Sequence, residues 1–521
     1  MAAKGEELSF LLAKGLTILG AEGSSEAISQ AFADFRSRRW PHRTRADAAR
    51  EAELWEVASV ASLSPQWPQH DGQSEGRRIT MRVRVQQLRG EFVQAKGVYS
   101  PPTFSRLGRG LGSRISRFRS ALIEAGFGDR EDIVAMLRLS TSHFSARRLC
   151  ERGRSLVTRA RTDGDKRPLG ALVRLFLLKW PVQAVTLRTI LGESVVHDLV
   201  ACRMLFRSPK PQNAQNGIWL ASAVQITPVH NNIFIATDWC TPWCEHSFCE
   251  PADERDLQLR VQSVETDTMA LVGAQRAWQL SPTPVVGRVV DLCSGPGVQG
   301  IVASLLWGAP VTFVDMNRRA LRFAAFNARL NGLSDGHVRL VLGDLRAIEP
   351  LLILQRSDAV VRGVLLVLAN PPYQPSPGDE LARLPLAADG GSSGEDITAA
   401  GVGAFCELTA AWSSCGYGTV ADEVSHVADG SRYQAAGAAL LMVTWLMNAR
   451  SLPSRLHAQW AWRCGPEVNW RLIAGWPPLT PEEYARTHFR RAPAGSGMED
   501  AYIQDLQQRG IHQISPGFLV A

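Results

Sequence analysis

Between residues 286 and 370 the chain repeats one pattern, in which a short apolar run is followed by an amphipathic stretch. Short apolar runs bounded by glycine or acidic residues are typical of buried strands, and three- and four-residue apolar spacing is typical of helices. Strands that alternate with helices predict an α/β, Rossmann-like doubly wound sheet, whose ligands bind beyond the carboxyl ends of the strands. The expected strands are GRVVDL (287–292), APVTFVD (309–315), HVRLVLGD (337–344) and GVLLVLAN (363–370).

A glycine-rich loop follows the first expected strand, in the sequence VVDLCSGPGVQG. Its Gly295, Gly297 and Gly300 match the G-x-G-x-x-G pattern between a strand and a helix, where glycines allow a tight turn and a close approach of the backbone to a ligand. Asp315 ends the second strand, where a carboxylate can accept hydrogen bonds from both ribose hydroxyls of an adenosine-containing cofactor. NAD and S-adenosylmethionine fit these features equally well.

Two further acids favour S-adenosylmethionine. Asp291 precedes the glycines, where it can reach a cofactor amino group but would repel a pyrophosphate. Asp344 follows the third strand and can accept a hydrogen bond from an adenine amino group. Asn317 and Leu345, next to these acids in the chain, are further candidates for contact with the cofactor.

The fourth strand ends in Asn370-Pro371-Pro372-Tyr373. Proline lacks a backbone donor and restricts the residue before it, so this tetrapeptide makes a stiff corner. The Asn370 side-chain oxygen and the Pro371 carbonyl can accept the two N–H bonds of an amide or an exocyclic base amine, while Tyr373 stacks on the planar group. Such a corner predicts catalysis by positioning a nitrogen against a sulfonium methyl group.

These motifs together resemble the class I S-adenosylmethionine-dependent methyltransferases, in particular the "methyltransferase small domain" branch. That branch includes the release-factor glutamine and ribosomal-RNA guanine methyltransferases. The resemblance covers residues 264–409 and implies catalytic roles for Asn370, Pro371, Pro372 and Tyr373. Outside it, segments such as LVRLFLLKWPV and LTPEEYARTHF resemble a two-domain bacterial methyltransferase family with an N-terminal helical domain. By resemblance ADGGSSGEDI (388–397) would be a loop that covers the substrate nitrogen.

The remaining chain predicts two further parts. Residues 1–110 form an Arg-rich extension, expected to be partly disordered. Residues 111–275 predict a mainly helical, winged-helix-like domain, with three short helices and a small sheet. Residues 276–521 then form the methyltransferase domain. Residues 1–180 contain 31 Lys and Arg against 19 Asp and Glu, and such a charge favours an acidic partner such as RNA as readily as a solvated arm.

The cysteines raise one alternative. Cys240, Cys244, His246 and Cys249 lie close together, but their spacing fits no common zinc site, and we expect no metal there. Nine cysteines in 521 residues do not form a disulfide scaffold, which favours a reducing compartment. The sequence has no run of apolar residues long enough to span a membrane. We therefore expect a cytoplasmic protein, although import into an organelle remains an alternative.

The sequence supports three functions. The first is an enzyme that methylates a planar nitrogen on a macromolecule, either a protein glutamine or an RNA base. The second is a methyltransferase of a small metabolite. The third is a nucleic-acid-binding protein in which the methyltransferase fold is not catalytic. The cofactor acids favour an enzyme, and the basic N-terminal third favours a macromolecular substrate. The oligomeric state does not follow from the sequence.

Overall fold

The computed structural model describes most of the chain from residue 111 onward. The described ranges are 111–139, 168–209, 216–239, 260–279, 285–347, 363–376, 388–391, 393–414, 437–448, 471–474, 478–488 and 498–521, with a few single residues between them. The expected extension 1–110 and the cluster of Cys240, Cys244, His246 and Cys249 lie outside the described residues.

The centre of the fold is a 7-stranded sheet in the order β11-β12-β10-β9-β6-β7-β8. Strands β6 to β10 pair in parallel, and β12 runs antiparallel between β10 and β11. The chain starts at β6, moves outward to β7 and β8, and returns to β9 on the other side, so the strand order reverses between β6 and β9. The strands are β6 (Val286–Leu292), β7 (Val311–Asp315), β8 (Val338–Leu342), β9 (Val364–Ala369), β10 (Ala438–Met447), β11 (Arg471–Ala474) and β12 (Ile514–Val520).

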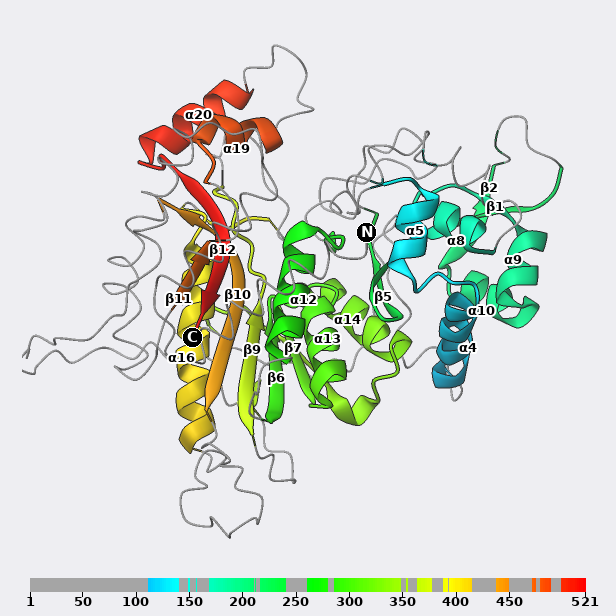
Figure 1. Ribbon diagram of the computed structural model, residues 1–521, viewed down its shortest axis with the longest axis horizontal. Helices are drawn as coiled ribbons and strands as arrows, with labels where there is room; N and C mark the ends of the chain where they lie inside the picture. The colour runs from blue at the N-terminus through cyan, green and yellow to red at the C-terminus, as the bar shows by residue number, and fades with distance from the viewer. Residues whose placement is uncertain are drawn as a thin grey trace, which may run out of the picture.

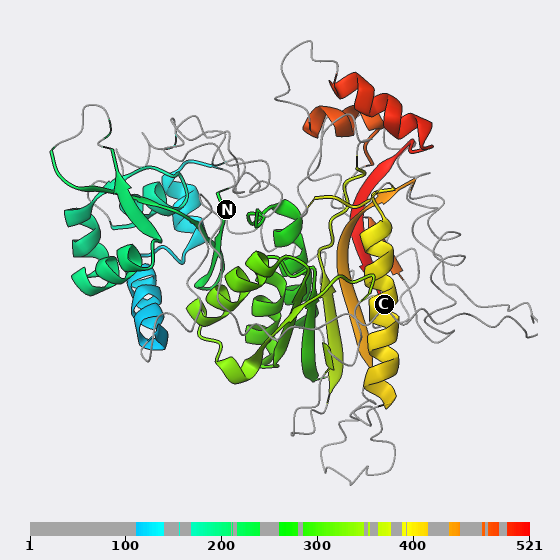
Figure 2. The same cartoon turned by 180° about the vertical axis from the view of Figure 1, so that it is seen from behind.

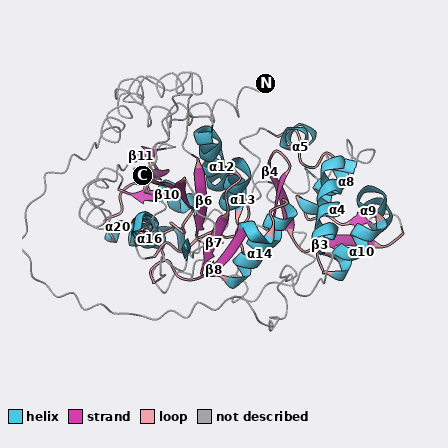
Figure 3. Cartoon of the chain, turned by 90° about the horizontal axis from the view of Figure 1, so that it is seen from below, coloured by secondary structure: helices cyan, strands magenta, loops and turns pink. Residues whose placement is uncertain are grey.

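Helices cover both faces of this sheet. Alternate residues of each central strand belong to two separate cores: Val289 and Leu366 face one side, and Val290 and Leu365 face the other. The first core is closed by α12 (Thr266–Gln279), α13 (Val298–Trp307) and α14 (Arg318–Leu330), the second by α16 (Asp396–Ser414). Figures 1 and 2 show this three-layer arrangement from opposite sides, and Figure 3 shows α16 and α12–α14 on either side of the strands. Both β6 and β9 are buried along their whole length; β9 is a continuous apolar run, whereas β6 also contains the buried Arg288 and Asp291.

The strands and helices expected from sequence between residues 286 and 370 are those of the structure. All four expected strands are present, and the stretch that follows the first of them, VQGIVASLLW, forms the helix α13. The sheet and its helices therefore form the α/β Rossmann-like fold that the alternation predicts. Two short helices, α19 (Pro481–His488) and α20 (Met498–Gln508), precede the final strand and lie beyond one end of the sheet (Figure 1).

The preceding part of the chain is mainly helical. It contains a three-stranded antiparallel sheet in the order β1-β3-β2. Its helices are interrupted near Pro181 and at Gly192. Residue 192 has a φ of 85°, which suits glycine. The elements are α4 (Leu111–Glu124), α5 (Arg130–Met136), α8 (Pro168–Phe176), β1 (Val182–Gln183), α9 (Ala184–Leu191), α10 (Glu193–Ala201), β2 (Leu205–Ser208) and β3 (Trp219–Ser222).

A β-hairpin joins the two parts. Its strands are β4 (Gln225–His230) and β5 (Ile233–Thr237), which pair antiparallel. One face of the hairpin contributes Ile226 and Phe234 to the core of the helical part, and the other contributes Ile235 to the core beneath α12–α14. The domain boundary expected at 275/276 falls inside α12, a continuous helix that packs against α13 and β10 of the sheet.

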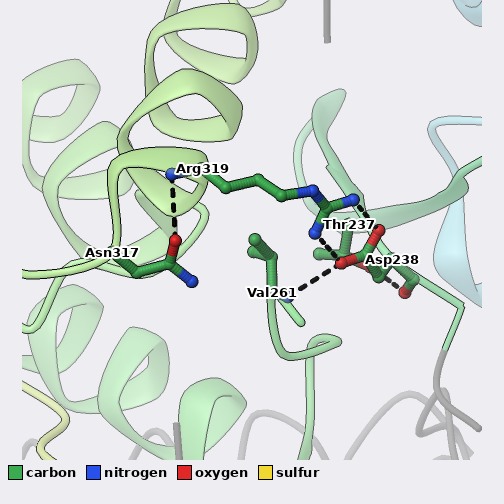
Figure 4. A network of polar contacts seen from close by, with 5 residues as sticks. All are labelled: Thr237, Asp238, Val261, Asn317 and Arg319. Carbon is green, nitrogen blue, oxygen red and sulfur yellow. Dashed lines mark hydrogen bonds and ion pairs between the residues drawn. The ribbon is translucent and has the colours of Figure 1, made fainter. Parts of the chain in front are cut away.

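A buried ion pair holds the hairpin on α14. The guanidinium of Arg319 donates two hydrogen bonds to the carboxylate of Asp238, which directly follows β5 (Figure 4). The side chains are only 7% and 15% exposed, respectively. Asp238 also accepts a hydrogen bond from the backbone N–H of Val261 at 2.8 Å, so one carboxylate connects three segments.

Two further observations concern the expected location of the protein. No helix in the described ranges is long and apolar enough to cross a membrane. Among the described cysteines, Cys202 and Cys293 are free thiols and Cys406 is disulfide-bonded, so the redox compartment does not follow from the number of cysteines.

We predict that Asp238→Ala destabilises the protein by about 3–5 kcal/mol, because it leaves the Arg319 cation buried without this carboxylate. The double variant Arg319→Met/Asp238→Leu should recover a large part of that loss, since it removes both charges together. Urea unfolding of the wild type and both variants measures the effect. A double variant that is less stable than Asp238→Ala would show that the pair is not the source of the loss.

Candidate functional site

The residues singled out from the sequence lie at the carboxyl ends of β6, β7, β8 and β9, where the strand order reverses. The pKa of Cys293, which follows β6, reflects how close the three carboxylates lie to one another. Burial raises the pKa of the Cys293 thiol well above its usual value, and the negative charges of Asp315, Asp291 and Asp344 raise it further. Three carboxylates that stand apart in the sequence therefore lie near one partly buried thiol, and their charges favour its neutral form.

The backbone angle or the surrounding space differs at each glycine of the loop. Gly297 has a φ of 84°, and an added Cβ would lie 3.0 Å from Ala324. A Cβ on Gly300 would lie 2.6 Å from the ring of Phe313, so this glycine lets α13 approach the sheet. Gly295 has a φ of 52°, but a Cβ there would meet no atom within 4 Å. Gly295 therefore faces open space, as the backbone next to a ligand must.

Asp291 of β6 holds the end of the glycine loop through a hydrogen bond. Its side chain is only 1% exposed, and Oδ2 accepts the backbone N–H of Gly300 in the first turn of α13 at 2.8 Å. Burial raises the pKa of this carboxyl well above its usual value, and the Gly300 bond opposes the shift. The structure thus places Asp291 as a support of the loop-to-helix transition, whereas the sequence predicted direct or water-mediated contact with a cofactor amino group.

Asp315 points into the site from the end of β7. Its Oδ2 accepts the N–H of Gly295 and its Oδ1 the N–H of Asn317, both at 2.7 Å. Burial raises its pKa to about 6, although both hydrogen bonds lower it. The Asn317 side chain accepts the N–H of Arg319 at 2.9 Å and so caps α14 (Figure 4). In this arrangement Asp315 connects the glycine loop to the backbone of Asn317, and Asn317 fixes the helix start beside it.

Asp344 lies on the outer side of the site, after β8. Its carboxylate is held by Arg346, whose Nε and Nη2 donate to it at 2.9 Å and 2.6 Å. This hydrogen bonding lowers the pKa of Asp344. The side chain of Arg346 is 57% exposed and can turn away from Asp344 at little cost. Leu345 is partly buried and packs against the core beneath α16.

The Asn-Pro-Pro-Tyr corner follows β9 and contacts α12. The Asn370 Nδ2 group donates to Asp267 Oδ2 at 3.1 Å and to Thr268 Oγ1 at 3.4 Å. The hydroxyl of Tyr373 donates to the same oxygen of Asp267 at 2.9 Å. These bonds fix the amide of Asn370 so that Nδ2 faces α12, which leaves Oδ1 as an acceptor. Pro371 is buried and Pro372 is partly exposed.

Tyr373 is held on one face by an aromatic side chain that the sequence did not indicate. Its ring stacks on Trp445 of β10 with centroids 5.7 Å apart and planes 12° apart. Burial, then the negative charge of Asp267, raises the pKa of the Tyr373 hydroxyl well above its usual value, so that it acts as a donor. Stacking on an acceptor, as predicted from the sequence, is therefore restricted to the other face of the ring.

Residues 388–391 pack directly on this corner. Gln374 N–H donates to the Ala388 carbonyl at 3.0 Å, and Gly390 N–H donates to the Gln374 carbonyl at 2.8 Å. A Cβ on Gly390 would lie 2.8 Å from Tyr373 Cα. A small pocket of about 230 Å³, including its open mouth, results; it is lined by Gln262, Asp267, Asn370, Pro371, Tyr373, Gln374 and Ala388.

Two residues in or near this pocket were not predicted from the sequence. Asp267 lies in the sequence TDTMALV, and Trp445 lies in the apolar run of β10. Neither has a local motif, because each reaches the corner only through the folding of a distant segment. The one available signal was the position of Asp267 in the first turn of a helix, where acidic residues are common in any case.

Comparisons with known proteins give three findings. Residues 145–215 match a family model described as a domain of unknown function, DUF7059. No curated protein matches the chain. Solved structures match only part of it, and at low identity.

Three of these solved structures serve as examples. The geranyl diphosphate C-methyltransferase of Streptomyces coelicolor A3(2), in complex with Mg²⁺, geranyl diphosphate and S-adenosyl-L-homocysteine, is 14% identical, covering 44% of this chain and 71% of its own, with a TM-score of 0.22. A SAM-dependent methyltransferase of Geobacter sulfurreducens, in complex with S-adenosyl-L-homocysteine, is 15% identical, covering 48% and 89%, with a TM-score of 0.23. The [4+2]-cyclase SpnF is 11% identical, covering 45% and 73%, with a TM-score of 0.22. Likenesses of this size assign no activity to this chain.

We predict that Asp315 contributes to the pH dependence of stability. Its folded pKa of about 6 lies above the ordinary value of 3.8, so the folded protein binds more protons than the unfolded chain between these values. The free energy of unfolding therefore falls as the pH rises through this window. In Asp315→Asn the fall between pH 4 and pH 6.5, measured by urea unfolding, should be smaller than in the wild type. Identical falls would contradict the assignment, because Asp291 is present in both proteins.

Proposed function

We propose that this protein is an S-adenosylmethionine-dependent methyltransferase that transfers a methyl group to a planar nitrogen of a macromolecule. The observation that carries the proposal is that two groups of residues lie together at the carboxyl ends of the parallel strands. An open glycine turn with Asp315 lies after β6 and β7, and an Asn370 amide oxygen is left as an acceptor after β9. The strand order supports the assignment, because it reverses between β6 and β9, and ligands of open α/β sheets bind at such a reversal beyond the carboxyl ends of the strands.

The residues of the site fit this cofactor. Gly295 leaves space beside the loop, and Asp315 has a carboxylate at the position where a ribose diol would replace the Gly295 N–H. Asp344 can accept a hydrogen bond from an adenine amino group once Arg346 turns outward. Asp291 is enclosed and supports the loop. The acids also suit a cofactor with a sulfonium cation, and they oppose a pyrophosphate such as that of NAD.

The bound cofactor would supply an electrophilic methyl group on a positively charged sulfur. The chain's own residues then have to place a weakly nucleophilic nitrogen in line with it. Asn370 Oδ1 and the Pro371 carbonyl accept the two N–H groups, and the two prolines limit motion of that carbonyl. Positive charge would develop on that nitrogen as it takes up the methyl group, and the Asn370 and Pro371 oxygens would stabilise this charge through their hydrogen bonds until a proton leaves to water.

Asp267 is a positioning residue in this proposal. It accepts hydrogen bonds from both the Asn370 amide and the Tyr373 hydroxyl, so a single carboxylate sets the orientation of two groups of the corner. Without it the amide of Asn370 could turn over and present Nδ2, a donor, to an acceptor nitrogen that also carries donors.

A protein amide fits the described residues better than an RNA base. The pocket is small and is lined by amide and carboxylate side chains. In the winged-helix-like module that the sequence predicts for the helical part, α10, the last helix before β2, would take the place of the recognition helix. However, α10 carries Glu193 and Asp198 and no Lys or Arg, and Asp198 pairs with Arg114 of α4 at 3.1 Å. This helix is therefore unsuited to a phosphate backbone.

We predict that the wild type binds S-adenosylmethionine more tightly than NAD in calorimetry. Asp315→Ala should lose about 2–4 kcal/mol of that binding, because both ribose hydroxyls lose their charged acceptor. Methyl transfer from labelled cofactor, followed in protein, RNA and metabolite fractions, identifies the acceptor. We expect the label in protein. Label only in RNA or only in metabolites would select one of the alternatives, and unchanged affinity in Asp315→Ala would contradict the cofactor site.

A second prediction concerns the corner itself. Asn370→Ala should lower kcat about 100-fold, the loss typical of a positioned polar group at a reacting centre. Asp267→Asn should lower kcat by a smaller factor, since Asn370 remains but is no longer held in one orientation. The dissociation constant for the cofactor, measured on both variants as a control, should change little. Wild-type turnover in Asn370→Ala would show that the acceptor nitrogen is not held at this corner.

A further inference from the structure

The outer edge of β5 pairs with side chains of a helix instead of with another strand. Asn331 of α14 accepts the N–H of Phe234 at 2.8 Å and donates to its carbonyl at 2.7 Å. One turn earlier, Asn327 accepts the N–H of Ala236 at 2.8 Å and donates to its carbonyl at 2.9 Å. Two asparagines thus satisfy the four backbone groups that β5 turns away from β4.

The spacing explains why a helix can do this. Residues 234 and 236 are two apart on a strand, a distance of about 6.8 Å, and residues 327 and 331 are four apart on a helix, about 6 Å. An amide side chain carries both a donor and an acceptor, as a backbone unit does. Each asparagine can therefore replace one residue of a missing neighbouring strand.

Asn327 makes one contact that Asn331 does not. Its Nδ2 group also donates to the carbonyl of Pro296, at 2.9 Å, in the middle of the glycine loop. The corresponding third bond of Asn331 runs to the backbone carbonyl of Asn327, inside α14. Both side chains are buried, with residue exposures of 0% and 4%. The two residues thus differ mainly in whether they reach the loop.

Two side chains hold the Gly295–Gly297 turn in the described structure, Asp315 at the Gly295 N–H and Asn327 at the Pro296 carbonyl, while Asp291 holds Gly300 in the first turn of α13. A ribose bound to Asp315 would compete with the first of these bonds. Asn327 would then hold the turn in place, with Gly295 and Gly297 at positive φ on either side of the anchored carbonyl.

We propose that Asn327 is a positioning residue of the cofactor site, and that through it the β4–β5 hairpin and the helical part set the affinity for the cofactor. This inference rests on the proposed function. The hairpin is fixed on α14 by the Arg319–Asp238 pair as well as by the two asparagines, so it forms a rigid connection from the helical core to the loop (Figure 4).

The test compares Asn327→Ala with Asn331→Ala, its matched control. Both variants remove a buried asparagine that pairs with β5, and both should lower the free energy of unfolding to a similar degree. Only Asn327→Ala should weaken S-adenosylmethionine binding, by 10-fold or more in calorimetry, and increase amide hydrogen exchange of residues 295–300. Asn327→Asp provides a second variant, because its carboxylate can still accept from Ala236 but cannot donate to Pro296.

Several outcomes would overturn the inference. Equal losses of affinity in the Asn327 and Asn331 variants would show that the hairpin acts only through general stability. Unchanged affinity and loop exchange in the Asn327 variants would show that Asn327 does not hold the loop. A wild type that binds no S-adenosylmethionine contradicts the proposed function itself and the cofactor part of this inference, while the exchange comparison still decides whether Asn327 positions the loop.

Discussion

The pairing of β5 with Asn327 and Asn331 is the interaction on which the arrangement of this protein depends. A buried strand edge must satisfy its N–H and C=O groups, and an unpaired group costs about as much as a lost hydrogen bond. Here the partners lie on α14 and at its C-cap, and α14 begins at Arg318, shortly after Asp315. The requirement therefore fixes the hairpin on α14 and joins the helical part to the face of the sheet that α12–α14 cover.

The electrostatics of the site follow from the same arrangement. Asp291 and Asp315 end neighbouring strands and are desolvated by the loop and by α13 and α14, which raises the pKa of both carboxyls. Asp291 offsets this cost by bonding α13, and Asp315 by bonding two backbone N–H groups. A positively charged ligand next to these acids would favour their ionised forms, so binding such a ligand and ionising Asp315 should support each other.

A feature could be predicted from the sequence where its pattern lies within a few neighbouring residues. The strands from β6 to β9, α13, α14 and the glycine turn were predictable, because apolar runs and glycine spacing are set within a few residues. The contact of Asp291 with a cofactor stays a prediction: its place before the glycines is visible in the sequence, but its burial and its hydrogen bond to α13 are not. Asp267, Trp445 and Asn327 could not be predicted, because each acts on a segment that is distant in the chain. Strand β10 and the antiparallel β12 were also beyond the local patterns, since their pairing brings together segments about 70 residues apart.

The central claim is that S-adenosylmethionine binds at the carboxyl ends of β6 and β7, on a loop held by Asn327. A crystal structure of the full chain with S-adenosylhomocysteine tests this claim most directly. The account predicts the ribose diol within hydrogen-bonding distance of Asp315, the adenine amino group near Asp344, and the Asn327–Pro296 bond retained. A ligand bound elsewhere, or a site in which the Asn327 side chain has left the Pro296 carbonyl, would contradict it.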